Sequence, residues 1–281
     1  MVARIRYIEK FEDRLGVQSY TFPLALYEYQ SQQGLRIAQA PAVGADYEYD
    51  FHRYFPAPKE VGVETIRFLN IGNTAALLET QIDDIRNKLY SFGRGKLWAL
   101  ASDGTRRWAW GRLRDMPTIQ VGVGRFRYTP HVLTFLRTSD WQEQNATTGS
   151  QAINAAGTVS FNIVAGGNAP IYDAVFRLRS NSATGWIDPT IYNNTNAYRM
   201  QTTRDATGSN DELKIDGNSK KILWSTDDGV NYANDYANFA YGSAQHDWFR
   251  LEGGGTSQIQ ISTPSGTPNF NFEWSFYAKW H

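Results

Sequence analysis

Residues 158–179 decide the fold class of the second half of this chain: Thr158–Val164 (TVSFNIV) runs into Gly167–Pro170 (GNAP), and Ile171–Arg179 (IYDAVFRLR) follows at once. Apolar residues alternate with polar ones in both outer segments, which is the period of a strand with one buried face. Glycine and proline between the segments interrupt the pattern, as at a turn. The stretch therefore predicts two β-strands. Its alternating apolar residues are Val159, Phe161, Ile163, Ala174, Phe176 and Leu178.

The same pattern continues to the end of the chain. Ile259 and Ile261 alternate with polar residues, and Asp216-Gly217 and Asp228-Gly229 are dipeptides typical of turns. Short strands at roughly 8–12-residue spacing are typical of antiparallel sandwiches. We therefore predict a β-sandwich over residues 158–281. Its last strand carries four aromatic residues on one face: Phe270, Phe272, Trp274 and Phe276.

The first half contains one segment with a different period. Five apolar residues follow one another at steps of three and four, which places them on one face of a helix. Asn73 or Thr74 can cap the start of this helix, and Gly93 can end it. The pattern predicts a helix over about residues 74–92. The residues of its apolar face are Leu78, Ile82, Ile85, Leu89 and Phe92.

A hairpin is predicted directly after the helix. The segments Leu97–Ala101 and Thr105–Leu113 flank Asp103-Gly104, a dipeptide suited to the positive φ angles of a tight turn. Alternation along the second arm places basic and tryptophan side chains on a common face. These residues are Arg106, Trp108, Trp110 and Arg112.

Composition favours a folded β-rich protein with two domains. The 281 residues are 41% hydrophobic and 20% charged, and 14% are aromatic, which suits pleated, half-buried sheet faces. No cysteine is present, so disulfides and cysteine-containing metal sites are excluded. Residues 1–140 hold 19 basic and 15 acidic side chains (+4), and residues 141–281 hold 9 and 13 (−4). We expect an N-terminal β domain with one helix (1–141), a linker (142–157) and the C-terminal sandwich (158–281).

The strongest charge feature is the segment from Arg86 to Arg137, with eleven basic and two acidic residues. Interleaved with Trp108 and Trp110, it could bind nucleic acid through phosphates and base stacking. It could equally pair with acidic residues of a neighbouring subunit or line a pore. A solvated strand face without a partner is as good an interpretation. The candidate interface or pore residues are Arg106, Arg107, Arg112, Arg114, Arg125 and Arg127.

Enzyme motifs are missing from the sequence. The four histidines, His52, His131, His246 and His281, form no pair at helical i, i+4 spacing, and there is no Gly-x-Ser-x-Gly. The adjacent pairs Asp83-Asp84 and Asp227-Asp228 are poor candidates for acid–base catalysis, because neighbouring carboxylates point different ways. We predict no catalytic, cofactor-binding or metal-binding residues, and no enzymatic activity.

Sugar binding is the alternative function, because flat aromatic faces suit the CH surfaces of sugars. Trp274 alternates with phenylalanines and is expected in the core, and Trp248 is also expected to be structural. Trp186 lies in the polar segment Asn181–Pro189, so we expect it to be exposed. It is the candidate contact of a carbohydrate-binding module that would attach to a host surface.

Three short motifs occur in a characteristic order: Gly167–Pro170, Leu213–Gly217 (LKIDG) and Asp247–Gly254 (DWFRLEGG). In this order they resemble the C-terminal sandwich, of galectin-like or jelly-roll type, in the distal tail proteins (Dit) of long-tailed bacteriophages. The helix followed by a hairpin resembles the ring-forming N-terminal domain of that family. The final strand of that domain usually runs into Asp-Pro and an aromatic residue. Here Asp140-Trp141 lacks the proline.

The resemblance implies a structural virion protein at the distal end of a phage tail. It implies a homohexameric ring of N-terminal domains, with the sandwiches projecting outward. One side of the ring would meet the tail-tube protein, and the other a tail-associated hub or receptor-binding protein. Phage DNA would pass through the ring without specific binding. No cofactor is implied.

Overall fold

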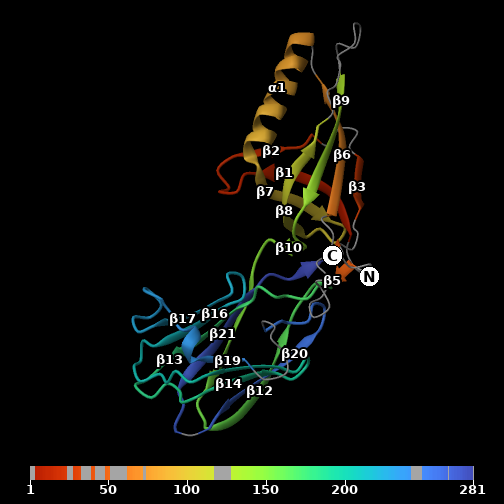
Figure 1. Ribbon diagram of the computed structural model, residues 1–281. Helices are drawn as coiled ribbons and strands as arrows, with labels where there is room; N and C mark the ends of the chain where they lie inside the picture. The colour runs from red at the N-terminus through yellow and green to blue at the C-terminus, as the bar shows by residue number, and fades with distance from the viewer. Residues whose placement is uncertain are drawn as a thin grey trace. The chain divides into compact units, whose positions relative to one another are not determined.

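The computed structural model describes residues 4–23, 28–32, 39–41, 48–50, 62–71, 74–116, 128–241, 249–264 and 266–280. The chain divides into two compact units, residues 1–141 and 142–281 (Figure 1). No helix among the described residues is long and apolar enough to cross a membrane.

The N-terminal unit is built on an antiparallel sheet with the strand order β2-β1-β7-β8-β9-β6-β3. Two short strands form a separate pair, β4 (Gln39–Pro41) with β5 (Glu48–Asp50). The strands of the sheet are β1 (Ile5–Glu12), β2 (Ser19–Thr21), β3 (Glu28–Gln32), β6 (Gly62–Ile71), β7 (Arg94–Ala101), β8 (Arg106–Asp115) and β9 (Tyr128–Arg137).

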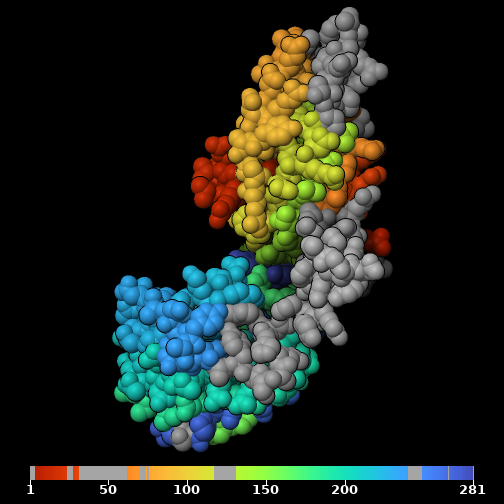
Figure 2. All heavy atoms as spheres, in the orientation of Figure 1, coloured from red at the N-terminus to blue at the C-terminus, as the bar shows by residue number. Residues whose placement is uncertain are grey.

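Helix α1 (Ala75–Phe92) confirms the predicted helix, and it covers one face of this sheet. The Thr74 hydroxyl accepts a hydrogen bond from the Leu77 N–H at 3.2 Å, and Gly93 ends the helix with φ 57°. All five residues of the predicted apolar face are buried, while the opposite side of the helix lies at the surface (Figure 2). The Phe92 ring lies 5.8 Å from Phe11 of β1, so the face that carries Phe11 is the helix-covered face.

Strands β7 and β8 confirm the predicted hairpin. Trp98 pairs with Trp108 across it, and Gly104 has the positive φ (82°) that the turn requires.

The C-terminal unit is a sandwich of two antiparallel sheets, as predicted. The first sheet has the order β11-β21-β13-β16-β17-β18, and the second β12-β20-β14-β15-β19. Strands of the first sheet are β11 (Thr147–Ile153), β13 (Val175–Ser180), β16 (Glu212–Asp216), β17 (Lys221–Ser225), β18 (Ala233–Asn234) and β21 (Phe270–Phe276). Strands of the second are β12 (Gly157–Val164), β14 (Thr190–Asn193), β15 (Tyr198–Thr202), β19 (Phe239–Tyr241) and β20 (Thr256–Thr263). Three short elements lie outside these two sheets: β10 (Trp141–Glu143), β22 (Lys279–Trp280) and the 3₁₀ turn η1 (Tyr236–Asn238).

Aromatic and branched side chains from both sheets fill one core. Phe176 of the first sheet stacks on Phe272 (5.6 Å) and meets Phe249 edge-on (5.0 Å). Ile191, Ile259 and other apolar residues of the second sheet belong to the same cluster. Burial of these side chains is the main source of stability in the unit.

The expected linker over residues 142–157 is wrong in its central part. Residues 147–153 form β11, which pairs with β21 along its whole length. The sequence did not predict this strand because its residues are small and polar. Only Ile153, at its end, is buried, so no apolar alternation is visible. Gly149 has a packing role there: a Cβ on it would lie 2.3 Å from the Trp274 ring.

The Gly167–Pro170 motif carries the chain from one sheet to the other, since β12 and β13 belong to different sheets. A Cβ on Gly167 would lie 2.0 Å from the Lys279 carbonyl oxygen, which accepts hydrogen bonds from the next two backbone N–H groups. A Cβ on Gly253 would lie 2.1 Å from the carbonyl oxygen of Ala169. Backbone therefore packs directly on backbone here, which explains why these glycine motifs occur together.

Candidate functional site

The site lies on the β7–β8 hairpin, on the sheet face opposite the helix. Phe11 pairs in register with Leu97, so buried Leu97 and Ala109 belong to the helix-covered face, and the residues alternating with them point the other way. We call this second set the basic-aromatic face. It consists of Lys10, Arg94, Lys96, Trp98, Arg106, Trp108, Trp110 and Arg112.

Cations and indole rings alternate across the strands of the basic-aromatic face. The Lys96 ammonium lies 5.2 Å from the Trp108 ring centre and 5.7 Å from that of Trp110. The Arg94 guanidinium lies 5.1 Å from Trp110, and the Lys10 ammonium 5.2 Å from Trp98. Trp108 and Trp110 meet edge-on at 5.6 Å. Each cation–π contact contributes about 0.5–1 kcal/mol at a partly exposed site, so the long side chains are held in place.

The tryptophans of this face are half-buried, so each keeps part of its ring at the surface. The face therefore offers large, rigid apolar area together with fixed positive charge. Tryptophan and arginine are the side chains that dominate protein interfaces, because they bury much area at little entropic cost. The arrangement can bind a partner with an apolar surface edged by carboxylates.

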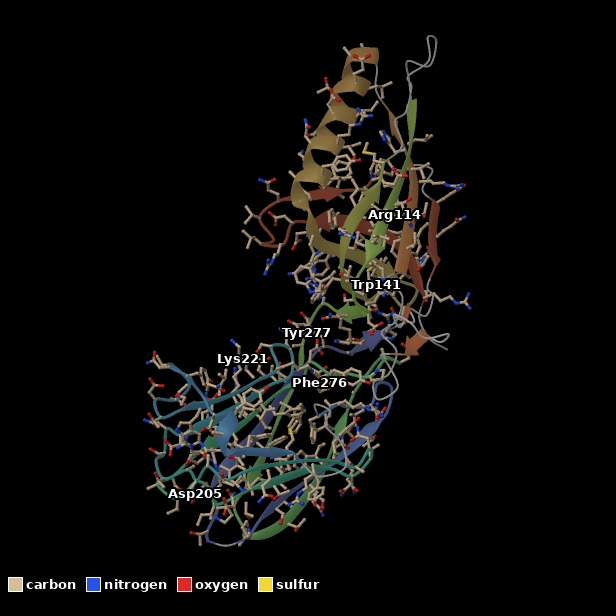
Figure 3. The ribbon with its side chains drawn as sticks, in the orientation of Figure 1. Arg114, Trp141, Asp205, Lys221, Phe276 and Tyr277 are labelled. Atoms are coloured by element: carbon tan, nitrogen blue, oxygen red, sulfur yellow. The ribbon has the colours of Figure 1, made fainter. Side chains whose placement is uncertain are left out.

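Three of the predicted arginines are exposed: Arg106, Arg112 and Arg114 (Figure 3 labels Arg114). Arg106 forms an ion pair with Glu9 at 3.0 Å. Arg112 pairs in register with Arg94, which places two like charges side by side. Arg125 and Arg127 lie outside the described residues.

Arg107 does not belong to the predicted surface. Its residue is 1% exposed, and its guanidinium forms an ion pair with Asp103 at 3.1 Å. Adjacent strand residues point to opposite faces, so Arg107 lies on the helix-covered face when Arg106 and Trp108 lie on the other.

Sequence reasoning also missed Lys10 and Trp98. The hairpin register that Asp103-Gly104 implies places Trp98 opposite Trp108, and this signal could have identified it.

Trp186 is not an exposed sugar contact. It is 1% exposed, and its indole N–H donates to the Arg204 carbonyl at 2.8 Å. Its ring packs against Phe270 at 5.3 Å and Trp224 at 6.0 Å. Although the surrounding segment is polar, the large apolar area of the indole favours its burial in the sandwich core. Trp248 lies outside the described residues.

The adjacent carboxylates serve local structure. Asp83 and Asp84 are exposed on α1, and Asp84 forms an ion pair with Lys88 at 2.8 Å. Asp227 organises a turn, where it accepts hydrogen bonds from the Ser225 hydroxyl and from Asn231. These hydrogen bonds lower the pKa of Asp227 to about 2, and the one from Ser225 has the largest effect. Within the described residues, no three histidine or acidic side chains gather as a metal site would require.

His131 is a core residue of the N-terminal unit; the other three histidines lie outside the described residues. Its ring stacks on Phe68 at 5.1 Å, and neither ring nitrogen has a hydrogen-bond partner among the described residues. Burial, followed by the positive charge of Arg86, lowers the pKa of His131 to about 4. The imidazole is therefore neutral at pH 7.

Protonation of His131 is expected to destabilise the protein in acid. Between pH 6.5 and pH 4 the unfolded chain binds a proton that the folded chain does not. The free energy of unfolding therefore falls as pH is lowered through this window, by up to about 3 kcal/mol from this group. Urea denaturation at about pH 7 and pH 4.5 should show a smaller loss for His131→Leu than for the parent protein. Equal losses would contradict the assignment.

No protein-family model matches the sequence, and no protein with a curated description matches it either. Among solved structures, the Dit protein of phage SPP1 matches with a TM-score of 0.54 at 11% identity, covering 98% of this chain and 93% of that one. That protein is described as a paradigm of the hub adsorption apparatus in phages that infect Gram-positive bacteria. The phage P2 baseplate in its activated conformation with calcium gives a TM-score of 0.42 at 10% identity, covering 99% of each chain.

The match to the SPP1 protein extends over both units. It confirms the expected fold, a helix-containing β domain followed by an antiparallel sandwich, and this fold is the one found in the SPP1 Dit protein.

Proposed function

We propose that this chain is a structural protein of a long-tailed phage, and that its copies form a hexameric ring at the distal end of the tail tube. The ring would connect the tube to the baseplate and its host-adhesion device. The observation that carries the proposal is the shared fold along nearly the full length of both chains, this one and the SPP1 hub protein. A chance likeness of one domain would not reproduce the order of two.

The basic-aromatic face supports assembly between copies. It joins three half-buried tryptophans to five cations, and the second half of the chain carries a net charge of −4. Opposite charges on the two halves favour docking of one copy on the next, because complementary fields orient the encounter. Trp108 and Trp110 would then supply the apolar centre of the contact.

Three further partners belong to the proposal: the tail-tube protein on one side of the ring, a hub or receptor-binding protein on the other, and the phage genome in transit. Basic residues near a lumen would attract the DNA backbone weakly and without sequence preference, because phosphates carry no base identity. Tight binding would slow the passage of DNA, so a scattered rather than continuous basic lining suits this role.

The oligomeric state tests the proposal. Mass photometry and negative-stain electron microscopy of the purified full chain should show closed rings with sixfold class averages. Rings held partly by charge should dissociate as salt is raised, because screening weakens exposed pairs. A strict monomer, both alone and mixed with the tail-tube and hub proteins of the same phage, would refute the proposal.

A further inference from the structure

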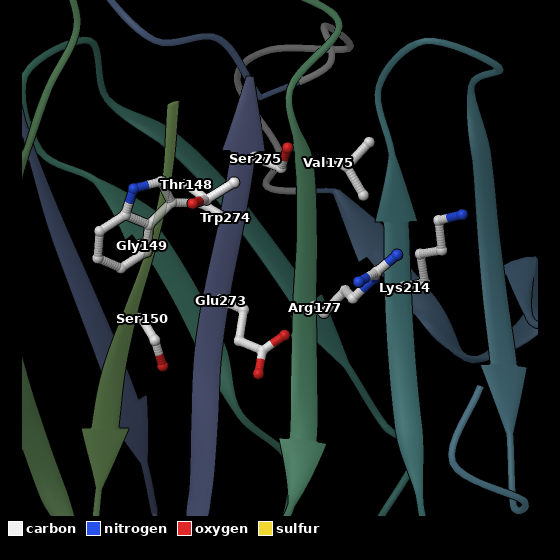
Figure 4. A pocket seen from close by; sticks show the side chains of 9 residues that line it. All are labelled: Thr148, Gly149, Ser150, Val175, Arg177, Lys214, Glu273, Trp274 and Ser275. Carbon is white, nitrogen blue, oxygen red and sulfur yellow. The ribbon is translucent and has the colours of Figure 1, made fainter. Parts of the chain in front are cut away.

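A polar groove lies on the sandwich, on the first sheet and on the side away from the core. Its volume is about 540 Å³, within the range of ligand sites, and it runs across β11, β21, β13 and β16 (Figure 4). Apart from Gly149 and Trp274, the lining residues alternate along their strands with core residues such as Phe176 and Phe272. They are Thr148, Gly149, Ser150, Val175, Arg177, Lys214, Glu273, Trp274 and Ser275.

Arg177 is held in the groove by a buried carboxylate beneath it. Glu212 is fully buried, and its carboxylate lies 3.4 Å from the Arg177 Nε and 3.1 Å from the Arg179 Nη2. The Tyr232 hydroxyl also donates to Glu212. Burial, followed by this hydrogen bond, raises the pKa of Tyr232 to about 12, so the hydroxyl keeps its proton. The Glu212 contact orients Arg177, whose guanidinium donates no hydrogen bond to any described residue.

Glu273 stands next to Arg177, and its carboxylate interacts with nearby Arg179 only through its charge. The two residues are paired in register across β21 and β13, and Ser150 is the partner of Glu273 on its other side. Within the described part of the chain, the Glu273 carboxylate takes part in no ion pair or hydrogen bond. Lys214 extends the row beyond Arg177, with its ammonium 3.8 Å from Asp216. One line therefore runs from a hydroxyl (Ser150) through a carboxylate acceptor (Glu273) to two cationic donors (Arg177 and Lys214).

The charges on this face compensate one another. Arg177 and Arg179 face Glu212, Lys214 faces Asp216, and Arg179 also meets Asp228 at 3.4 Å. With Glu273 included, the face has no excess of positive charge, which a polyanion would need. The hydroxyls of Thr148, Ser150 and Ser275 add neutral donors and acceptors.

We propose that this groove binds an uncharged glycan. A sugar presents neighbouring hydroxyl groups that both donate and accept hydrogen bonds, and a row of one acceptor, Glu273, and two donors, Arg177 and Lys214, complements them. Val175 supplies apolar surface for its CH groups. Trp274 pairs in register with Phe176 and points to the core, where its ring stacks on Phe161 at 5.6 Å. The groove would add contact with a glycan to the structural role, and the inference does not depend on ring formation.

Direct binding to neutral oligosaccharides tests the inference. The full chain would be titrated with maltotriose, cellotriose, lactose and tri-N-acetylchitotriose, using saturation-transfer NMR and calorimetry. We expect at least one of them to bind with a Kd of about 1 mM or tighter. Glu273→Ala should weaken that binding at least about tenfold, because it removes the carboxylate acceptor of the row. The melting temperature should change by no more than a few degrees, since the carboxylate forms no ion pair or hydrogen bond with a described residue and acts on Arg179 only through its charge.

The matched control is Arg199→Ala, which removes an exposed arginine from the second sheet, where it bonds to Gln201 at 2.8 Å. It should leave sugar binding unchanged. Arg177→Gln gives a second test and should weaken binding like Glu273→Ala. The inference is overturned if no neutral probe binds at about 10 mM. It is also overturned if binding survives both groove variants, or if only a polyanion such as heparin binds. Mass photometry of the same samples reports ring formation separately, so the two proposals can fail independently.

Discussion

Replacing Glu64 with alanine is expected to lower the free energy of unfolding of the N-terminal unit by about 3–5 kcal/mol. Glu64 is 0% exposed and accepts hydrogen bonds from Arg137 Nε at 2.7 Å and from the Tyr29 hydroxyl at 2.6 Å. These contacts join β3, β6 and β9. Burial and the Glu64 charge raise the pKa of Tyr29, so its hydroxyl remains a donor. Without Glu64, the buried Arg137 charge would have no carboxylate partner in the described part of the chain.

Urea denaturation of the purified protein measures this effect. Glu64→Gln should cost less than Glu64→Ala, because the amide oxygen can still accept from Arg137 while its NH2 can donate to the Tyr29 hydroxyl. The matched control is Glu28→Ala, which breaks the exposed Glu28–Arg67 pair at 3.5 Å and should cost less than about 1 kcal/mol. If Glu64→Ala and Glu28→Ala had equal effects, the buried network would not have the stabilising role assigned to it. Replacing Glu64 and Arg137 together by leucine and methionine should recover most of the loss.

Local patterns predicted the helix and the hairpin, because each depends on neighbouring residues. The helix from Ala75 to Phe92 follows from steps of three and four between apolar residues, and from a cap at Thr74. The β7–β8 turn follows from Asp103-Gly104. The division of β12 and β13 between two sheets could not be predicted in this way. It depends on backbone contacts between segments about 80 to 110 residues apart, such as Gly167 with Lys279.

The candidate site was predicted only in part, because local patterns place neighbouring residues but do not show which distant residues the fold brings together. Alternation along β8 placed Arg106, Trp108 and Trp110 on one face, but pooling all nearby arginines ignored that alternation and included Arg107. Trp186 was misjudged because the polarity of a segment does not decide whether one large ring in it is buried. The groove was missed since Arg177, Glu212 and Glu273 lie on three strands that only the fold brings together.

Replacing Trp110 with alanine is expected to abolish formation of the proposed ring at micromolar concentration. Truncating a central interface tryptophan costs about 2–4 kcal/mol per contact, and every contact in a ring carries the change. The Arg94 and Lys96 cations would also lose the indole over which they lie, at 5.1 and 5.7 Å, so the charges that steer docking would no longer be fixed.

Mass photometry across a concentration series distinguishes this effect from unfolding. The monomer should keep its melting temperature within a few degrees, because Trp110 lies on the face opposite the helix-covered core. Tyr90→Ala is the matched control: it removes an aromatic side chain that is 59% exposed on α1, and rings should form as in the parent protein. If Trp110→Ala assembled at the parental concentration while Tyr90→Ala did not, the contact between copies would lie on the helix side. A salt-dependent interface at Trp110 would then be excluded, because removing the Trp110 side chain would not have changed assembly.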